Sequence, residues 1–226
     1  MRLRFRPLTN IPTGWYVRRV PTATRRSSRE LLLDAAVAVI RTQGLHATTV
    51  DDLCAAAGVS KGAFFHHFAS KVDLAIAAAD HWSVTTSRLF AEAAFHDHHD
   101  PADRVFGYLD FRLSIIGDAI EQYTCLVGTM VQETYATHPA IRAACAASIL
   151  GHAETLEADI AAALHHADPG TSDVASRARS LARYTQVVLQ GAFVVSKAAD
   201  DPELARDSVA HLRHYFEMLL QPSQGA

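Results

Sequence analysis

The sequence predicts an all-α protein in which several short helices at the N-terminal end precede a larger helical part. The chain has 226 residues, and 40 of them are alanines spread along almost its whole length. Alanine, leucine and arginine favour helices, and no segment alternates apolar and polar residues for long enough to predict a strand. Glycine, proline and capping residues recur at intervals that would separate one helix from the next.

Three short helices are expected first, over residues 29–43, 50–57 and 61–68. Ser28, Thr49 and Ser60 directly precede them, and each can accept a hydrogen bond from a first-turn N–H group. Gly44 and Gly58 follow the first two helices, where glycine commonly ends a helix. The short lengths and close caps predict a compact group of helices.

Six further helices, most of them longer, are expected after this group. Their predicted ranges are 71–95, 101–117, 119–137, 140–165, 172–199 and 202–220. Ser70 can cap the first of them, and Pro101 suits the first position of the second. Polar or turn-forming residues at 96–100, 168–170 and 200–201 separate neighbouring helices. The sequence thus predicts about nine helices and no sheet.

The net charge of −3 conceals two segments of opposite sign. Residues 1–71 contain 11 basic and 4 acidic residues, a balance of +7, whereas residues 72–226 contain 10 basic and 20 acidic residues, a balance of −10. A hydrophobic content of 49% excludes a disordered chain. A basic N-terminal part can bind a polyanion such as a nucleic acid, and an acidic remainder suggests a second function.

The segment 48–71 carries the most specific pattern, which is a helix, a tight turn and a second helix. Leu53, Val59 and Phe64 are spaced to pack the two helices together, and Gly58 permits a positive φ between them. The second helix would expose small residues and a lysine. Small side chains allow a close backbone approach to DNA, as a recognition helix in the major groove requires.

The stretch from about Arg29 to Trp82 resembles the DNA-binding head of TetR-family transcriptional regulators. The similarity lies in Gly44-Leu-His-Ala-Thr-Thr-Val, Ala57-Gly-Val-Ser-Lys-Gly and His66-His-Phe-Ala-Ser-Lys. This resemblance implies a helix-turn-helix domain followed by a larger, variable helical domain that binds a ligand and dimerises. The expected organisation is a flexible basic arm (1–24), a helix-turn-helix domain (25–71), an effector-binding and dimerisation domain (72–220) and a polar tail (221–226).

The resemblance also implies which residues contact DNA. Thr49 and Lys71 would each hold a phosphate, and the remaining contacts would come from Ser60, Lys61, Gly62, Ala63, Phe65, His66 and His67. The family usually has tyrosine where this chain has Phe65. Phenylalanine keeps the packing but loses a hydrogen bond to phosphate, at a cost of about 1 kcal/mol. The arginines of the arm could offset this loss, or the arm could be a tail without a role.

The implied effector pocket lies among the middle helices and the implied dimer interface lies on the last two. The pocket candidates are Trp82, Phe90, Phe106, Leu109, Asp110, Leu113, Cys125, Met130 and Glu133. The interface candidates are Tyr184, Val188, Gly191, Val195, Leu212, Tyr215, Phe216 and Leu219. Each apolar candidate could instead be ordinary core.

These features predict a homodimeric repressor that a small hydrophobic effector releases from a palindromic operator in double-stranded DNA. An activator or a ligand-independent regulator on the same fold is the alternative, and Cys125 could act as a thiol sensor of electrophiles, although a buried structural cysteine is favoured. No phosphate loop, nucleophile motif or metal motif indicates an enzyme, and no cofactor is expected. His96, His98 and His99 are read as a solvated turn, not a metal site.

The ends of the chain suggest a cytoplasmic protein. The N-terminal segment is rich in arginine but lacks the apolar stretch of about 7–15 residues found in a signal peptide. Three cysteines do not form a complete set of disulfides. No uncharged apolar window is long enough to cross a membrane, since the best candidate, residues 184–196, has 13 uncharged residues.

Overall fold

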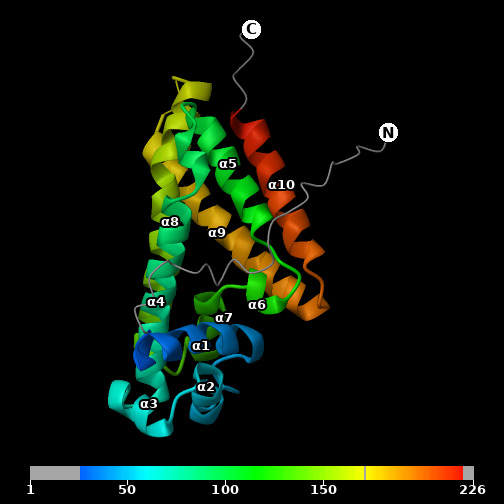
Figure 1. The fold of residues 1–226 in the computed structure, drawn as a ribbon. Helices are drawn as coiled ribbons and strands as arrows, with labels where there is room; N and C mark the ends of the chain where they lie inside the picture. Colours follow the sequence, from blue (N-terminus) through cyan, green and yellow to red (C-terminus); the bar gives the residue numbers. More distant parts are fainter. Residues whose placement is uncertain (1–25, 171, 221–226) are drawn as a thin grey trace.

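The computed structural model describes residues 26–170 and 172–220, and this part of the chain is entirely helical (Figure 1). The predicted arm and polar tail lie outside the described residues. The elements are α1 (Ser28–Gln43), α2 (Val50–Ala57), α3 (Lys61–His67), α4 (Lys71–Ala91), the 3-10 helix η1 (Ala94–Asp97), α5 (Pro101–Ser114), α6 (Ile120–Tyr123), α7 (Leu126–Thr134), α8 (Pro139–Ala167), α9 (Val174–Ala199) and α10 (Glu203–Leu220). The predicted all-α class is confirmed.

The single helix predicted over residues 119–137 was wrong, because the chain forms two short helices, α6 and α7, with a break at Thr124 and Cys125. Both residues have extended backbone angles. The carbonyl of Thr124, which would accept a bond from within a continuous helix, instead accepts one from Arg41 Nε at 2.7 Å. A long-range contact therefore takes the place of a helical hydrogen bond.

Several other helix ends also differ from the predicted ones by one to four residues, among them the end of α5 at Ser114 in place of residue 117 and the start of α9 at Val174 in place of residue 172. The helix starting at residue 71 ends at Ala91, and η1 follows it before α5 begins. The cap of α1 is Ser27, not Ser28. Its hydroxyl accepts a bond from the N–H of Glu30 at 3.2 Å, and the Glu30 carboxylate accepts the Ser27 N–H at 2.8 Å. This reciprocal capping box satisfies two N–H groups at once, which explains why the helix starts one residue earlier.

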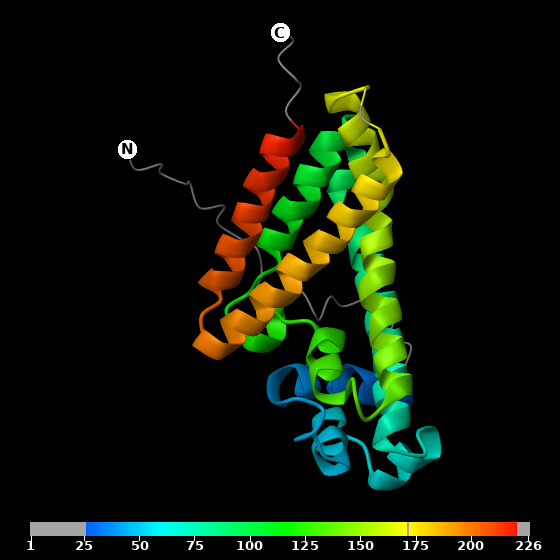
Figure 2. The ribbon, with the colours of Figure 1, turned by 180° about the vertical axis from the view of Figure 1, so that it is seen from behind.

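The buried residues form two clusters, one at each end of the molecule. The lower cluster joins α1 to α4 with α7 and the first turns of α8, and its buried members include Ile40, Leu53, Phe64, Leu74, Met130 and Ile141. The upper cluster joins α5, α8, α9 and α10. Figure 2 shows α7 lying directly against the N-terminal helices, with α8 and α4 running from them to the opposite end. The N-terminal helices therefore share one core with a helix from later in the chain.

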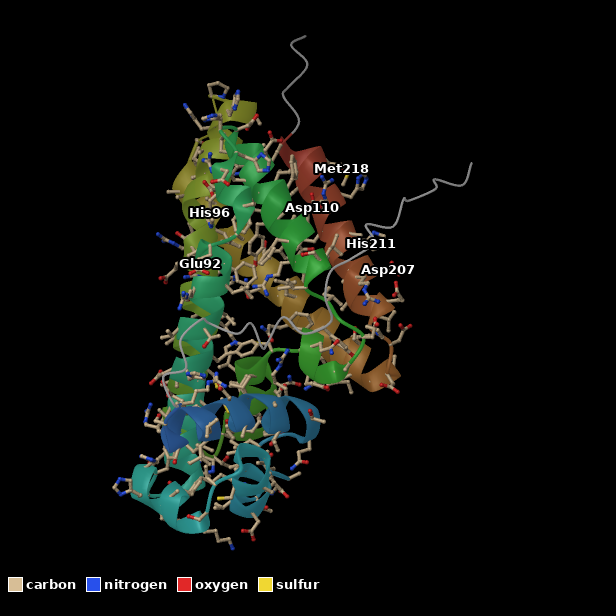
Figure 3. All side chains as sticks on the ribbon, in the orientation of Figure 1. Glu92, His96, Asp110, Asp207, His211 and Met218 are labelled. Atoms are coloured by element: carbon tan, nitrogen blue, oxygen red, sulfur yellow. The ribbon has the colours of Figure 1, made fainter. Side chains whose placement is uncertain are left out.

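Helix α10 packs against α5 and α9 and closes the upper cluster. Leu212 and Phe216, predicted to lie in a subunit interface, are instead buried inside the monomer, and Phe216 is 1% exposed. The apolar face of α10 is covered by its own chain, which explains why these two residues cannot form a free surface. Figure 3 shows His211 and Met218 on the outer side of the same helix.

Replacing Phe216 with alanine is expected to lower the free energy of unfolding by about 3–5 kcal/mol, because it empties a packed site. His211→Ala, on the exposed side of α10, should change it by no more than about 0.5 kcal/mol. Urea denaturation followed by circular dichroism measures both values. Equal, small effects of the two substitutions would contradict the assignment of Phe216 to the core.

Candidate nucleic-acid interface and internal cavities

Helices α2 and α3 form a helix-turn-helix whose turn depends on Gly58. This glycine has φ +66° and ψ +33°, a left-handed conformation that side chains with a Cβ rarely adopt. A Cβ at this position would meet nothing within 4 Å, so the conformation and not the space calls for glycine. The N–H of Val59 then bonds to the carbonyl of Cys54 at 3.0 Å and closes the turn. Leu53 and Phe64 are fully buried beneath it, as predicted.

Helix α3 presents most of the predicted DNA-contacting residues on its outer face. Those exposed are Ser60, Lys61, Gly62, Phe65 and His66, while Ala63 and His67 are half-buried. Phe65 is 57% exposed, and its ring lies edge-on to buried Phe64 with 5.1 Å between the centroids. The contact with Phe64 supports the Phe65 ring in an exposed position, where it could contact a bound molecule. The face combines small residues, one cation and this ring.

The ammonium of Lys61 is paired with a carboxylate of the preceding helix. Its Nζ lies 2.7 Å from Asp51 Oδ1, and both side chains are well exposed. The hydrogen bond to Asp51 raises the pKa of Lys61, so the lysine is charged at neutral pH. An exposed pair of this kind contributes little to stability and can be exchanged for a stronger anionic partner.

Thr49 and Lys71, the two predicted phosphate contacts, are both engaged within the protein. The Thr49 hydroxyl takes part in a capping box with Asp52 at the start of α2. Lys71 Nζ donates to the carbonyl oxygens of Leu45 at 2.9 Å and Thr48 at 2.8 Å. Its ammonium therefore holds the turn between α1 and α2, and a contact with phosphate would require it to leave these carbonyls.

Hydrogen bonds made by Arg41 and Glu133 connect the N-terminal helices to the segment that contains α6 and α7. Arg41, at the end of α1, donates to the Thr124 carbonyl and lies 4.9 Å from the centroid of the Trp82 ring. Glu133 of α7, predicted in the pocket, instead accepts a bond from the N–H of His46 at 2.6 Å. Gly44 permits this approach, because a Cβ there would collide with the Glu133 carboxylate. The first contact joins the last turn of α1 to the break between α6 and α7, and the second joins the α1–α2 turn to α7.

The upper part of the molecule contains two cavities of about 230 Å³ and about 160 Å³. The larger cavity is lined by residues that include Phe95, Arg104, Tyr108, Leu109 and Asp159. The smaller cavity is lined by residues that include Arg41, Trp82, Arg112, Cys125 and Gln186. Phe90 and His152 line both, so these two side chains form a wall between the cavities.

A polar cluster of Tyr108, Arg112 and His152 lies at this wall. Arg112 donates from Nε to the Tyr108 hydroxyl at 2.9 Å and from Nη2 to His152 Nε2 at 2.7 Å. Its guanidinium also lies 4.2 Å from the centroid of the Phe90 ring. Burial, followed by the positive charge of Arg112, lowers the pKa of His152 to about 3. The imidazole is therefore neutral at physiological pH, and Arg112 alone carries charge in this cluster.

Four of the nine predicted pocket residues line a cavity, namely Trp82, Phe90, Leu109 and Cys125. The other five line neither. Phe106 and Asp110 both contact Arg213 of α10, Leu113 packs at the edge of the upper cluster, Met130 is in the lower cluster and Glu133 contacts the α1–α2 turn. Met130 and Glu133 were misplaced because α7 turned out to pack against the N-terminal helices.

Sequence reasoning missed Arg41, Arg112, His152 and Gln186, which are polar residues in the lining of the smaller cavity. Their signal in the sequence is a polar residue beside apolar residues of a helical stretch, as in Gln-Val-Val-Leu, which begins at Gln186. Gln186 is only 5% exposed, and its Nε2 has no hydrogen-bond partner. Buried polar groups usually have partners, so an unpartnered amide beside a cavity is informative.

The three cysteines are free thiols. Cys54 and Cys145 are buried, as expected for structural residues, and burial raises the pKa of Cys145 to about 12. Cys125 is half-buried and lines the smaller cavity. Within residues 26–170 and 172–220, no group of three or more histidine, cysteine or carboxylate side chains could hold a metal ion. None of the helices in that part of the chain is long and apolar enough to cross a membrane.

The outer face of α9 carries an exposed apolar stripe. Of the predicted interface residues, Tyr184, Gly191, Val195 and Tyr215 are exposed, and Val188 and Leu219 are half-buried. The stripe also contains Val187, which is 66% exposed, and Val194, neither of which was among the predicted interface residues. Met218 on the adjoining α10 is also exposed and was not predicted either. Tyr184 and Tyr215 lie together, with ring centroids 5.7 Å apart, which joins the faces of the two helices.

Two family models match the chain. Residues 32–78 match bacterial regulatory proteins of the tetR family, and residues 101–210 match the C-terminal domain of LmrA/YxaF-like transcriptional regulators. The chain is similar to the HTH-type transcriptional repressor KstR2 of Mycobacterium tuberculosis, with 46% identity over 48 residues, and to KstR2 of Rhodococcus jostii, with 44% identity over 50 residues. These matches cover 21% and 22% of this chain and about a quarter (24%) of each relative.

Solved structures resemble the whole fold. A TetR transcriptional regulator from Chloroflexus aurantiacus has a TM-score of 0.70 at 24% identity, covering 84% of this chain and 94% of its own. The regulatory protein TetR from Rhodobacter sphaeroides has a TM-score of 0.69 at 22% identity, covering 86% and 99%. The first family model falls on the helix-turn-helix described above, and the two models together cover more than half of the chain. The protein belongs to the TetR family of transcriptional regulators.

Proposed function

We propose that this TetR-family regulator is a homodimeric repressor that binds a palindromic operator through α3 and is released by a small hydrophobic effector bound in its cavities. The observation that carries the proposal is Arg41. This residue belongs to the N-terminal helices, yet it lines the smaller cavity and bonds to the start of α7. Occupation of the cavity and the placement of the DNA-binding helices would thus depend on the same side chain.

Recognition of DNA is supported by the outer face of α3. Ser60, Gly62 and Ala63 allow a close approach to the major groove, and Lys61 supplies charge for a phosphate. Phe65 would make apolar contact at the edge of this surface. Lys61 would exchange Asp51 for phosphate upon binding, so the carboxylate of Asp51 acts as an internal competitor of the DNA backbone.

Release by an effector is supported by the way the two parts of the chain are connected. The Arg41–Thr124 and Glu133–His46 bonds hold the N-terminal helices at a defined angle. An effector in the smaller cavity would touch Arg41 directly and alter the first of these bonds. It would then favour one orientation of the two DNA-binding heads. The resulting change in operator affinity can be no larger than the ratio of the effector's affinities for the two orientations.

Dimerisation is supported by the apolar stripe of α9 and the adjoining face of α10. Val187, Val194, Val195 and Met218 are all at least two-fifths exposed. A contiguous exposed apolar face of this kind commonly marks a protein interface. A two-fold dimer built on it would present two α3 helices to the two halves of a palindrome.

Removing the charge of Lys61 should weaken operator binding and reduce the salt dependence by one phosphate contact for each subunit of the dimer. We expect Lys61→Ala to lower the slope of log K against log salt by about 2 for the dimer, whereas Asp51→Asn should tighten binding by removing the competing carboxylate. Arg179 is an arginine of α9 paired with Glu157, and Arg179→Ala is the matched control. It should leave both the operator affinity and the salt slope unchanged. Fluorescence anisotropy with DNA from upstream of the protein's own gene, at several salt concentrations, measures these effects.

The same titration tests the proposed function itself. Absence of specific, salt-sensitive binding by the unmodified protein would refute a DNA-binding repressor acting at this locus. Transcription in vitro from the same DNA then separates repression from the alternative of activation, because the two give opposite changes in transcript level at saturating protein.

A charge placed in the apolar stripe should prevent dimerisation. Val187→Glu is expected to give a monomer that loses two-site operator binding, because the interface would have to bury an unpaired carboxylate. Val84→Glu is the matched control, since Val84 on α4 is a valine of similar exposure outside the stripe. Sedimentation velocity measures the oligomeric state. A dimer in Val187→Glu and a monomer in Val84→Glu would show that the interface lies on α4 instead.

A further inference from the structure

We infer that the smaller cavity is built to bind an apolar molecule carrying a single carboxylate, with Arg112 as the residue that recognises the carboxylate. This inference rests on the proposed function, because it names the chemical class of the effector. It depends on the charges and hydrogen-bond donors that line the cavity, which differ from those of the neighbouring larger cavity.

The charge of Arg112 is not neutralised by the protein. The hydrogen-bond partners of its guanidinium are the Tyr108 hydroxyl and the Nε2 of His152, and its face lies on Phe90. All three are uncharged, since the low pKa of His152 keeps it neutral. No Asp or Glu within ion-pairing distance of Arg112 occurs in the described ranges 26–170 and 172–220. A half-buried cation without a carboxylate favours the binding of an anion.

The larger cavity provides an internal comparison. Its arginine, Arg104, forms an ion pair with Asp159 at 2.7 Å, and both residues line that cavity. Its charge is therefore already balanced. In the smaller cavity, no acidic residue of the described chain is part of the lining, and the hydrogen-bond partners of Arg112 are uncharged. The smaller cavity thus differs from its neighbour in that no carboxylate of the described chain balances the charge of Arg112.

A second, independent observation points to a polar ligand group in the same place. Gln186 of α9 lines the smaller cavity with its Nε2 buried and unpartnered. An amide N–H group in this position loses its bonds to water without gaining others, at a cost of about 1–3 kcal/mol. A ligand oxygen would satisfy it. Donors on Arg112 and Gln186 require an acceptor, and a carboxylate has two acceptor oxygens.

The rest of the lining limits the charge and shape of the ligand. Most of the cavity wall is apolar, with Trp82, Ile115 and Phe193 among its residues. Bringing a doubly charged phosphate into such surroundings costs more than bringing a monoanion. Arg112 uses Nε and one N–H of Nη2 within the protein, which leaves the Nη1 end for a carboxylate. An apolar body with one carboxylate therefore fits best.

The inference can be tested by fluorescence without DNA. The chain has two tryptophans, so a Trp15→Phe variant leaves Trp82, in the wall of the smaller cavity, as its only one. This variant is titrated with straight-chain carboxylates from hexanoate to dodecanoate and with 4-phenylbutyrate, each beside its uncharged amide. We expect at least one carboxylate to bind about tenfold or more tightly than its amide, as loss of one charge-assisted contact implies.

Variants then assign the preference to Arg112. In the Trp15→Phe background, Arg112→Gln should weaken carboxylate binding about tenfold and leave amide binding within about threefold, whereas Arg112→Lys should keep part of the preference. Arg179→Gln removes a charge outside the cavity and should change neither carboxylate binding nor amide binding. The inference is overturned if amides bind as tightly as carboxylates, if no carboxylate binds at millimolar concentration, or if the preference survives in Arg112→Gln.

Operator binding by the same variants separates this inference from the proposed function. If the protein binds its operator specifically but shows no preference for carboxylates, the proposed function stands and only the ligand class is rejected. If it prefers carboxylates through Arg112 but binds no operator, the carboxylate site stands and the proposed function is rejected. The comparison of carboxylate with amide uses no cavity variant, so it stands even if Arg112→Gln fails to fold.

Discussion

The hydrogen bond from Arg41 to the carbonyl of Thr124 is the interaction on which the arrangement of this protein depends. It ends α6, separates it from α7 and fixes the last turn of α1 against both. The guanidinium is buried, and its position over Trp82 adds α4 to the same junction. A buried arginine costs free energy to desolvate unless its donors are satisfied. The carbonyl released by the break in the helix meets part of that need, so the break and the arginine stabilise one another.

The division of charge along the sequence does not coincide with a division of the core. Basic residues are concentrated in the N-terminal 71 residues, and the acidic excess is in the remainder. The lower core nevertheless contains residues from both segments, because α7 and the first turns of α8 pack among α1 to α4. The charge boundary along the sequence is therefore not a boundary in the core. This shared core gives a mechanical connection between the helix-turn-helix and the helices that follow it.

The helix-turn-helix was predictable from the sequence, because short-range signals define it. Thr49, Gly58 and Ser60 act on residues within a few positions of themselves, and the structure places them as caps and turn. The cavities were only partly predictable. Arg41 and Thr124 are 83 positions apart, and Glu133 and His46 are 87 apart, so no local pattern relates them. On α10, periodicity identified the apolar residues but could not say that α5 and α9 of the same chain would cover Leu212 and Phe216.

The wall between the two cavities has a consequence for how such a protein can change its ligand. Among the described residues, Phe90 and His152 are the two that line both spaces, and neither belongs to α3 or to the apolar stripe of α9. Shortening one of them would merge two compartments into one longer chamber without altering α3 or the apolar stripe of α9. The range of molecules that fit the cavities could thus evolve by single substitutions that leave the proposed DNA contacts and the proposed dimer interface unchanged.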